Sequence, residues 1–346
     1  MMLIVILLLG ALPLTAQTRL RVTETAGLPR VNEPVTVTIN GKSQTYFVSI
    51  GPKQKRTFKL SVLQTKERLK VKQTGAAGFA IENSAFLADH SPRSVNGVEE
   101  DSGTLRGLTY KAASVTLLRT QNRMHWAPSF QRTGARAYSS MAMWSPVQQT
   151  SNTMGESWYS AKREGSHALY PEIKLRSEYC FFAHVPYFLF EATMDIVSPI
   201  DMFWLRGQEM TMDDLFTHLV APDANGQPRL MRFDERQAIL EKSPLPADSW
   251  IAFVNLDKGY GFGAVPLSWS ATTQVNPHLS VDDGAGNGKY WDRHIISRVS
   301  TPLKAGDKFT ERTAFVLFRP RPGAPAAEFL EWRNRLLHPL QAEPVR

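Results

Sequence analysis

The side chains best suited to act on a substrate lie between residues 123 and 209. This stretch brings arginine, histidine, tyrosine, tryptophan and glutamate together near proline-bounded bends and along an apolar strand region. Arginine and histidine can bind charge or move protons, and the flat faces of tryptophan and tyrosine suit sugar rings. The candidate residues are Arg123, His125, Trp126, Arg132, His167, Tyr170, Glu172, Tyr187, Glu191, Trp204, Arg206 and Glu209.

This mixture of residue types suits β-elimination from a uronic acid. An arginine or a metal must neutralise the carboxylate so that the C5 proton becomes acidic. A histidine, tyrosine or lysine then removes that proton, and a tyrosine or water protonates the leaving oxygen. A glycoside hydrolase would instead need two carboxylates about 5 to 10 Å apart, and the spacing of the glutamates pairs none of them. We assign catalytic roles to His125, Tyr187, Arg132 and Arg206, and substrate binding to the other candidates.

Each assignment has a structural alternative. Period two places Tyr187 and Glu191 on the same strand face, which is either a groove or an ordinary solvent-facing surface. His167 stands in a Gly/Ser-rich loop and could be a surface residue, and Arg206 could be an internal salt-bridge partner. His125 also stands in a loop, where functional residues are common.

No cofactor or metal site is predicted. The acidic runs Glu99–Asp101 and Asp282–Gly288 could offer oxygens to calcium, but neither matches a spaced ligand loop and both are typical of turns. The sequence has no histidine pair at zinc spacing, no phosphate-cradling glycine loop after a strand and no Gly-x-Ser-x-Gly motif. Cys180, the only cysteine, is expected to be a buried structural thiol.

Strands must position these residues. From Phe79 to Pro320, short alternating segments are separated by Asn, Gly and Pro turns, which is typical of an antiparallel β-sandwich. Two helices are predicted, one capped by Thr211 over Met212–Val220 and one over Ala326–Leu337 that ends at His338-Pro339. The clearest strands are Tyr187–Ile196, Trp250–Asn255, Tyr260–Trp269, His294–Val299 and Thr313–Phe318.

A small β domain is predicted ahead of this sandwich. Asn40-Gly41, between apolar alternating segments, is a strong hairpin signal. Strands at Thr57–Leu63 and Arg68–Lys72 complete the small domain, and Gly75–Gly78 is a linker. The predicted organisation is a signal peptide at 1–16, a small β domain at 17–78, a large β-sandwich at 79–320, and a C-terminal helix and tail at 321–346.

Residues 81–111 mark the start of the larger domain. Ile81–Asp89 is expected to be a half-buried strand and Thr104–Lys111 a second one. This hairpin resembles the first hairpin of mutarotase-like and polysaccharide-lyase sandwiches, and Lys304–Asp307 before Phe309 resembles their closing strands. Glu24–Val35 is similar to the start of rhamnogalacturonan exolyase-like proteins. The resemblance implies a mainly β fold, with a supersandwich-type antiparallel β-sandwich after a small β domain, and a carbohydrate ligand.

The first residues predict export. Met1–Gly10 is an uninterrupted apolar run, and Ala11–Ala16 ends in a small-x-small pattern with cleavage expected after Ala16. A retained membrane anchor is the alternative, but the run is short for a bilayer span. A single cysteine, which allows no intramolecular disulfide, suits a Gram-negative periplasm or exterior. We expect a secreted or periplasmic protein with no membrane span in the mature chain.

The net charge of +8 is concentrated near the N-terminus. Residues 1–111 hold 15 Lys and Arg against 8 Asp and Glu. Along Arg68–Lys72 the cations alternate with apolar residues and therefore share one strand face. That face either discourages edge pairing or guides a polyanion. Nucleic acid is not expected, because aromatic residues are not interleaved with this charge.

The leading functional hypothesis is an exported polysaccharide lyase that acts on an acidic polysaccharide or oligosaccharide. One alternative is a non-catalytic glycan-binding or cell-envelope protein, in which an aromatic groove holds sugar without cleaving it. Another is a mutarotase-like sugar epimerase, which needs a histidine base and a carboxylate facing one pocket. The sequence leaves the oligomeric state open.

Overall fold

Two compact units make up the chain. The computed structural model describes residues 19–63, 68–95, 98–118, 128–212, 215–237, 240, 245–246, 248–284 and 288–345. Residues 1–66 with 338–346 form one unit, and residues 67–337 form the other. The predicted class is confirmed: a mainly β chain with a small β region, a large antiparallel sandwich and a short helix near the C-terminus. The predicted domain boundaries at residues 78 and 320 stay predictions.

The smaller unit is built from short antiparallel strands around its own core. Strand β1 lies between β26 and β4, and β2 pairs with β3. The β2–β3 turn is the predicted hairpin, because Asn40 and Gly41 both adopt positive φ angles of 50° and 75°. Its strands are β1 (Arg19–Thr23), β2 (Arg30–Ile39), β3 (Lys42–Ile50), β4 (Lys55–Lys59) and β26 (Gln341–Val345).

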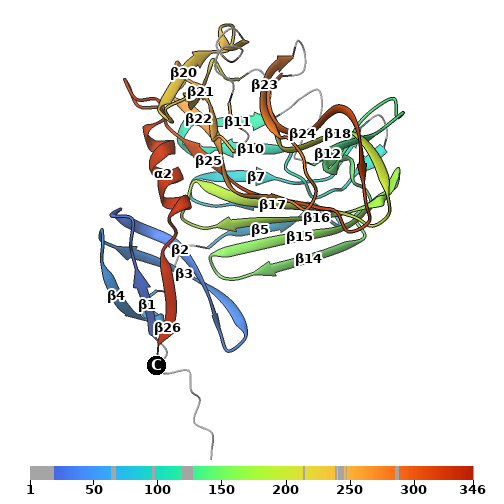
Figure 1. The fold of residues 1–346 in the computed structure, drawn as a ribbon. Helices are drawn as coiled ribbons and strands as arrows, with labels where there is room; N and C mark the ends of the chain where they lie inside the picture. The colour runs from blue at the N-terminus through green and yellow to red at the C-terminus, as the bar shows by residue number, and fades with distance from the viewer. Residues whose placement is uncertain are drawn as a thin grey trace, which may run out of the picture. The chain divides into compact units, whose positions relative to one another are not determined.

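A nine-stranded sheet dominates the larger unit (Figure 1). Its strand order is β14-β15-β16-β17-β25-β22-β21-β19-β20, and neighbouring strands pair in antiparallel orientation. The strands are β14 (Gln149–Met154), β15 (Trp158–His167), β16 (Tyr170–Phe182), β17 (Tyr187–Ile196), β19 (His218–Pro222), β20 (Pro228–Arg232), β21 (Ile251–Asn255), β22 (Tyr260–Ala271) and β25 (Lys308–Phe318).

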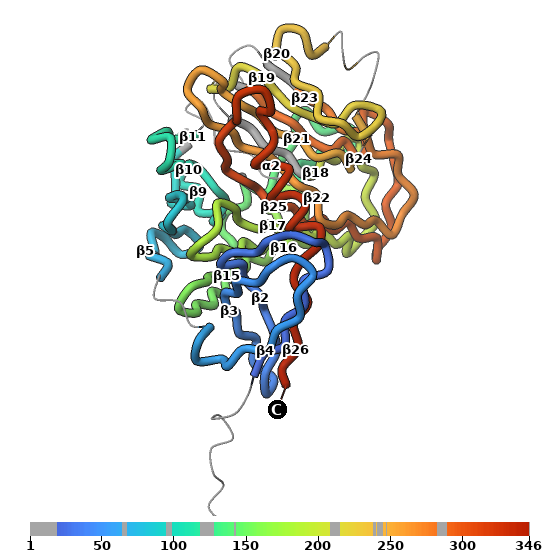
Figure 2. The backbone as a smooth tube through the Cα atoms, turned by 90° about the vertical axis from the view of Figure 1, so that its left-hand side faces the viewer, coloured from blue at the N-terminus to red at the C-terminus, as the bar shows by residue number. Residues whose placement is uncertain are grey.

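Two five-stranded sheets pack with it in the same unit (Figure 2). We call β11-β10-β7-β6-β5 the first sheet and β13-β12-β18-β24-β23 the second sheet. The first contains β5 (Lys70–Gln73), β6 (Phe79–Glu82), β7 (Phe86–Asp89), β10 (Gly107–Tyr110) and β11 (Val115–Leu118). The second contains β12 (Ser129–Arg132), β13 (Ser139–Ser140), β18 (Ile200–Met212), β23 (His278–Gly284) and β24 (Gly288–Leu303). The hairpin of β8 (Arg93–Val95) and β9 (Val98–Glu100) is separate, and short 3₁₀ turns are η2 (Leu60–Val62), η3 (Lys111–Ala113) and η4 (Met141–Met143).

One hydrophobic core joins the three sheets. Phe86 of the first sheet, Leu205 of the second and Phe315 of the nine-stranded sheet belong to the same buried cluster. Helix α2 (Ala327–Leu337) confirms the predicted C-terminal helix, and its Phe329 packs against Trp250 and Phe318. Because β-strands alternate their side chains, each sheet has one face in this core and one face away from it.

The predicted single strand at 81–89 is wrong, because the segment is a hairpin of β6 and β7. Asn83 forms the turn between them: its side-chain oxygen accepts the N–H groups of Ala85 and Phe86. Its amide also donates to the carbonyl of Phe182 on the neighbouring sheet. An asparagine that bonds the backbone two residues ahead initiates turns in this way. The predicted return strand is present as β10, which pairs with β7.

One other local prediction is wrong. The helix predicted over 212–220 does not extend to Val220, since β19 begins at His218 and pairs with β20 and β21, so sheet pairing overrides the capping signal. The predicted strand at 68–72 is present as β5, which pairs with β6. Gly75–Gly78 is accordingly a packed turn between β5 and β6, in which Gly78 accepts two backbone hydrogen bonds.

Within the described residues, no helix has the length and apolarity needed to cross a bilayer.

Gly103 lies next to the hydrogen bond from Arg163 of β15 to the Ala77 carbonyl in the β5–β6 turn, where any side chain would clash. Its φ is +65°, and an added Cβ would lie 2.7 Å from Arg163 Nε and 2.8 Å from the Ala77 carbonyl oxygen. We expect Gly103→Ala to lower the free energy of unfolding by about 3 kcal/mol, from left-handed strain plus the clash. Urea denaturation measures it.

Gly134 provides the control for this prediction. It has a similar φ of +81°, but nothing lies within 4 Å of its added Cβ. Gly134→Ala should therefore cost only the strain, about 1 kcal/mol. Equal losses in the two variants would contradict a steric role for Gly103.

Candidate functional site

The candidate site lies on the face of the second sheet that points away from the core. Leu205 and Gly207 of β18 line the space next to the nine-stranded sheet, so Arg206 between them points outward. On β24, Trp291 is a core residue, and Asp292 therefore projects from the opposite face. Register then places Arg206 opposite His294, and His294 opposite His278. We call Trp204, Arg206, His278, Asp292 and His294 the histidine cluster.

Asp292 is the electrostatic centre of the histidine cluster. Its side chain has 0% exposure, and its two oxygens contact different side chains: Arg206 Nη1 lies 2.7 Å from Oδ2, and His294 Nε2 lies 2.9 Å from Oδ1. The Arg206 guanidinium also stacks on the rings of Tyr138 and Trp204, at 5.2 and 5.3 Å. Arg206 is thus held on three sides, and the buried carboxylate is neutralised.

His278 is the histidine that faces a ligand-sized space. Its ring lies 4.9 Å from the ring of His294. It lines a cavity of about 380 Å³ together with polar Gln274, Asn276 and Ser297. In the part of the chain that the structure describes, neither ring nitrogen of His278 has a hydrogen-bond partner.

Desolvation, followed by the neighbouring His294, lowers the pKa of His278 below its usual 6.5. Asp292 opposes this shift but does not cancel it. The imidazole is therefore neutral at pH 7 and can accept a proton.

Arg298 adds a cation next to the histidine cluster. It has a left-handed φ of 55° where the β18–β24 register shifts, a conformation that non-glycine residues seldom adopt. This turn sets its guanidinium 5.0 Å above the Trp204 ring. Arg298 is exposed, and across the described ranges it has no ion-pair partner. It can therefore bind an anionic ligand.

Four of the predicted site residues meet elsewhere, at the rim between the second sheet and the nine-stranded sheet. Arg132 contacts both oxygens of Glu172, at 3.3 and 2.9 Å, and stacks over Tyr170 at 4.7 Å. His167 is buried rather than a loop surface residue, and burial lowers its pKa. Its Nδ1 accepts the Leu169 N–H at 3.1 Å. These contacts join two sheets and leave little of Arg132 for a ligand.

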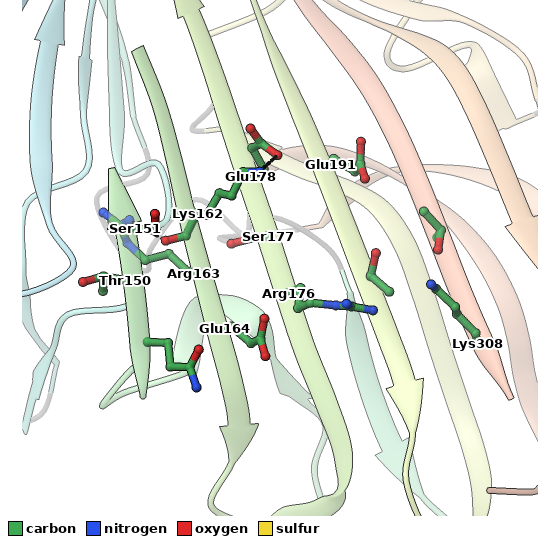
Figure 3. Close-up of a pocket in the computed structure, with 13 residues that line it drawn as sticks. Thr150, Ser151, Lys162, Arg163, Glu164, Arg176, Ser177, Glu178, Glu191 and Lys308 are labelled. Carbon is green, nitrogen blue, oxygen red and sulfur yellow. Dashed lines mark hydrogen bonds and ion pairs between the residues drawn. The ribbon is translucent and has the colours of Figure 1, made fainter. Parts of the chain in front are cut away.

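Two further predicted residues lie on the nine-stranded sheet. Tyr187 is buried and packs against Phe182 and against Trp332 of α2, at 6.1 and 5.6 Å between ring centroids. Glu191 lies in a groove on the face of this sheet that points away from the core (Figure 3). Although both share a strand face, as predicted, helix α2 covers one and leaves the other exposed.

The remaining predicted residues fall outside what the structure describes. Arg123, His125 and Trp126 are in the undescribed segment 119–127, and Glu209 belongs to β18 but its side chain is not described. Of the predicted set, the histidine cluster therefore contains Trp204 and Arg206. Sequence reasoning missed Asp292, His294, His278 and Arg298.

Among the described residues, no group of three or more His, Cys, Asp or Glu side chains is arranged so that it could hold a metal ion. Cys180 is not suited to nucleophilic chemistry, since burial and then the nearby Glu178 carboxylate raise the pKa of its thiol to about 12.

Comparisons with known proteins point to the fold. Neither a protein-family model nor a curated protein matches this chain. An α-mannosidase from Enterococcus faecalis V583 aligns with 97% of this chain and 46% of its own at 10% identity and a TM-score of 0.56. A glycosyl hydrolase family 38 protein from Enterococcus faecalis aligns with 96% and 48% at 10% identity and a TM-score of 0.52. Heparan sulfate lyase HepC from Pedobacter heparinus aligns with 70% of this chain and 33% of its own, at 9% identity and a TM-score of 0.39.

The chain spans about half the length of the α-mannosidase and of the family 38 protein. At 10% identity the likeness to them is one of fold. The chain thus shares a β-rich architecture with carbohydrate-active proteins.

The buried Arg206–Asp292 pair should be necessary for the stability of the second sheet. Arg206→Ala leaves the Asp292 carboxylate buried without its strongest partner, and we expect a loss of about 3–5 kcal/mol in the free energy of unfolding. Replacing both residues by leucine removes the uncompensated charge, so the double variant should be the more stable of the two. Urea denaturation with matched far-UV circular dichroism measures both, and a single variant as stable as wild type would contradict the role.

Proposed function

We propose that this chain is an exported carbohydrate-active protein that cleaves an acidic glycan by β-elimination at the histidine cluster. The observation that carries the proposal is His278, a neutral imidazole without a hydrogen-bond partner in the described structure, beside a cavity of about 380 Å³. The shared fold with an α-mannosidase and a family 38 glycosyl hydrolase supports a carbohydrate ligand. The apolar run Met1–Gly10 supports export.

Each step of the elimination has a residue of the right type. Arg298 binds the uronate carboxylate, and its charge makes the C5 proton more acidic. The neutral imidazole of His278 removes that proton, a double bond forms between C4 and C5, and the C4–oxygen bond breaks. Tyr138, a residue that is 40% exposed, donates the proton of its hydroxyl to the leaving oxygen.

Arg206 has a different role from the predicted one in this scheme. Its guanidinium is bound to Asp292 and stacked between two aromatic rings, so it positions the site. Asp292 in turn orients the imidazole of His294, and the His294 ring packs against the ring of His278. The carboxylate-binding role passes to Arg298.

Binding without cleavage is the second candidate function. It is favoured by the buried ion pair between Arg206 and Asp292, which is typical of a structural pair rather than a reactive one. A mutarotase-like epimerase is less well supported: Asp292 is completely buried, Glu172 is paired with Arg132, and Glu191 contacts no histidine in the described part.

Lyase activity is tested by incubating the purified full chain with pectic, alginate-like and sulfated glycans and following the absorbance of the unsaturated product. We expect product formation with a uronic-acid glycan. His278→Ala should reduce kcat/KM by about 100-fold or more, the usual contribution of a general base. Arg298→Ala should lower kcat/KM as well, because every substrate of this elimination carries the carboxylate that Arg298 binds.

A matched control is His218→Ala, which removes a half-buried histidine of β19 that hydrogen bonds Thr217. It should leave the rate unchanged. The lyase proposal would be contradicted if the wild-type protein and His278→Ala bound glycan equally and neither formed unsaturated product. The protein would then be assigned as a glycan-binding protein.

The pH dependence of kcat/KM should report the His278 base. The residue acts in its neutral form, which is present above its pKa and lost as pH falls through it. Because desolvation lowers that pKa from 6.5, the acidic limb of the profile should have its midpoint below pH 6.5. An acidic limb with its midpoint above 6.5 would contradict this assignment.

A further inference from the structure

A groove of about 490 Å³ crosses the nine-stranded sheet on the face away from the core. Its volume lies within the range of small-ligand sites, roughly 300–1,000 Å³. The outward residues of three neighbouring strands form its floor in cross-strand rows: Lys162, Glu178 and Glu191 form one row, and Glu164, Arg176 and Thr193 form the next. Figure 3 shows Lys162 and Glu164 of β15, Arg176 and Glu178 of β16 and Glu191 of β17 among the residues that line the groove.

The cations of the groove are already bound to carboxylates. Lys162 lies 3.3 Å from Glu178, and Arg176 lies 2.5 Å from Asp195. Lys308 is 3.9 Å from the other oxygen of Asp195. A strongly anionic ligand would have to compete with these partners.

The net charge of the groove is zero. Arg163, although it borders the groove, turns into the protein to bind Ala77. The other charged lining residues are Lys162, Arg176 and Lys308 against Glu164, Glu178 and Glu191.

Glu191 is the exception to this pairing. It lies opposite Arg312 in the β17–β25 register, where opposite charges commonly meet. Within the described ranges, however, its carboxylate has no hydrogen-bond or ion-pair partner. Thr150 and Ser151 of β14 and Thr310 of β25 add hydroxyl groups to the lining of the groove. The groove therefore offers an open acceptor and several hydroxyls, without an excess of either charge.

We propose that this groove is a second glycan-binding site, distinct from the histidine cluster, and that it takes an uncharged oligosaccharide. Sugar hydroxyls donate to Glu191 and exchange hydrogen bonds with the threonine and serine hydroxyls, and the paired charges present both donors and acceptors. The site lies on the opposite side of the core from the histidine cluster, since the two sheets bury their other faces against one another. It is independent of the proposed elimination.

Isothermal titration of the full chain with neutral gluco-, manno-, xylo- and galacto-oligosaccharides tests the site, with uronic-acid oligosaccharides as the comparison. At least one neutral oligosaccharide should bind saturably. Glu191→Ala should weaken that binding by at least about tenfold, or about 1.4 kcal/mol, while Glu191→Gln, which keeps an acceptor oxygen, should weaken it less.

Two variants sharpen the charge argument. Asp234→Ala removes an exposed carboxylate that pairs with Arg232 outside the groove, and it should bind like wild type. Glu178→Gln leaves Lys162 without its carboxylate and gives the groove a charge of +1, so it should gain affinity for uronic-acid oligosaccharides. All variants should keep the wild-type circular dichroism spectrum.

The inference is overturned if no neutral oligosaccharide binds, if Glu191→Ala binds as well as wild type, or if Glu191-dependent binding favours uronic acids in the wild-type protein. The experiments distinguish failure of this groove proposal from failure of the proposed elimination. His278→Ala should keep full binding in the groove, and Glu191→Ala should keep the elimination rate, so each variant tests one site alone.

Discussion

A buried guanidinium holds two sheets of the larger unit together. Arg163 on β15 is 1% exposed, and it donates through Nε and Nη2 to the Ala77 carbonyl in the β5–β6 turn and through Nη1 to Asn152 on β14. Its guanidinium also lies 5.5 Å from the Phe79 ring centre. Burial of a charge costs several kcal/mol unless its hydrogen bonds are made, so this contact tolerates few alternatives. Gly103 lies beside this contact, where the Cβ of any other residue would clash with Arg163 and with the Ala77 carbonyl.

A second buried guanidinium acts at the other five-stranded sheet. Arg293 on β24 points into the core and lies 3.7 Å from Glu311 of β25, while burial lowers its pKa. Because side chains alternate along β24, an inward Arg293 obliges Asp292 and His294 to face outward. The core contact and the histidine cluster are thus two consequences of one strand register. A shift by one residue would bury the histidine and expose the arginine.

This dependence on register explains what the sequence could and could not predict. Local hydrophobic periodicity and turn residues were enough to predict β17, β22, β25 and helix α2. The helix expected over 212–220 failed, since pairing of β19 with distant strands decided its conformation. His278 and Arg206 are 72 residues apart in the sequence and meet only through β24, so no spacing rule could have joined them. Arg132 was found, but its partner Glu172 comes from another sheet.

The inner and outer charges of the sandwich obey different constraints. Arg163 and Arg293 are fixed by the fold, because an unsatisfied buried charge would unfold it. The ion pairs of the groove are partly exposed, as Lys162 and Glu178 are at 59% and 30%, and such pairs contribute about 0–1 kcal/mol to stability. Stability alone would therefore allow many other charge patterns on that face. A balanced set of charges around an open Glu191 is better explained by a ligand than by the needs of the fold.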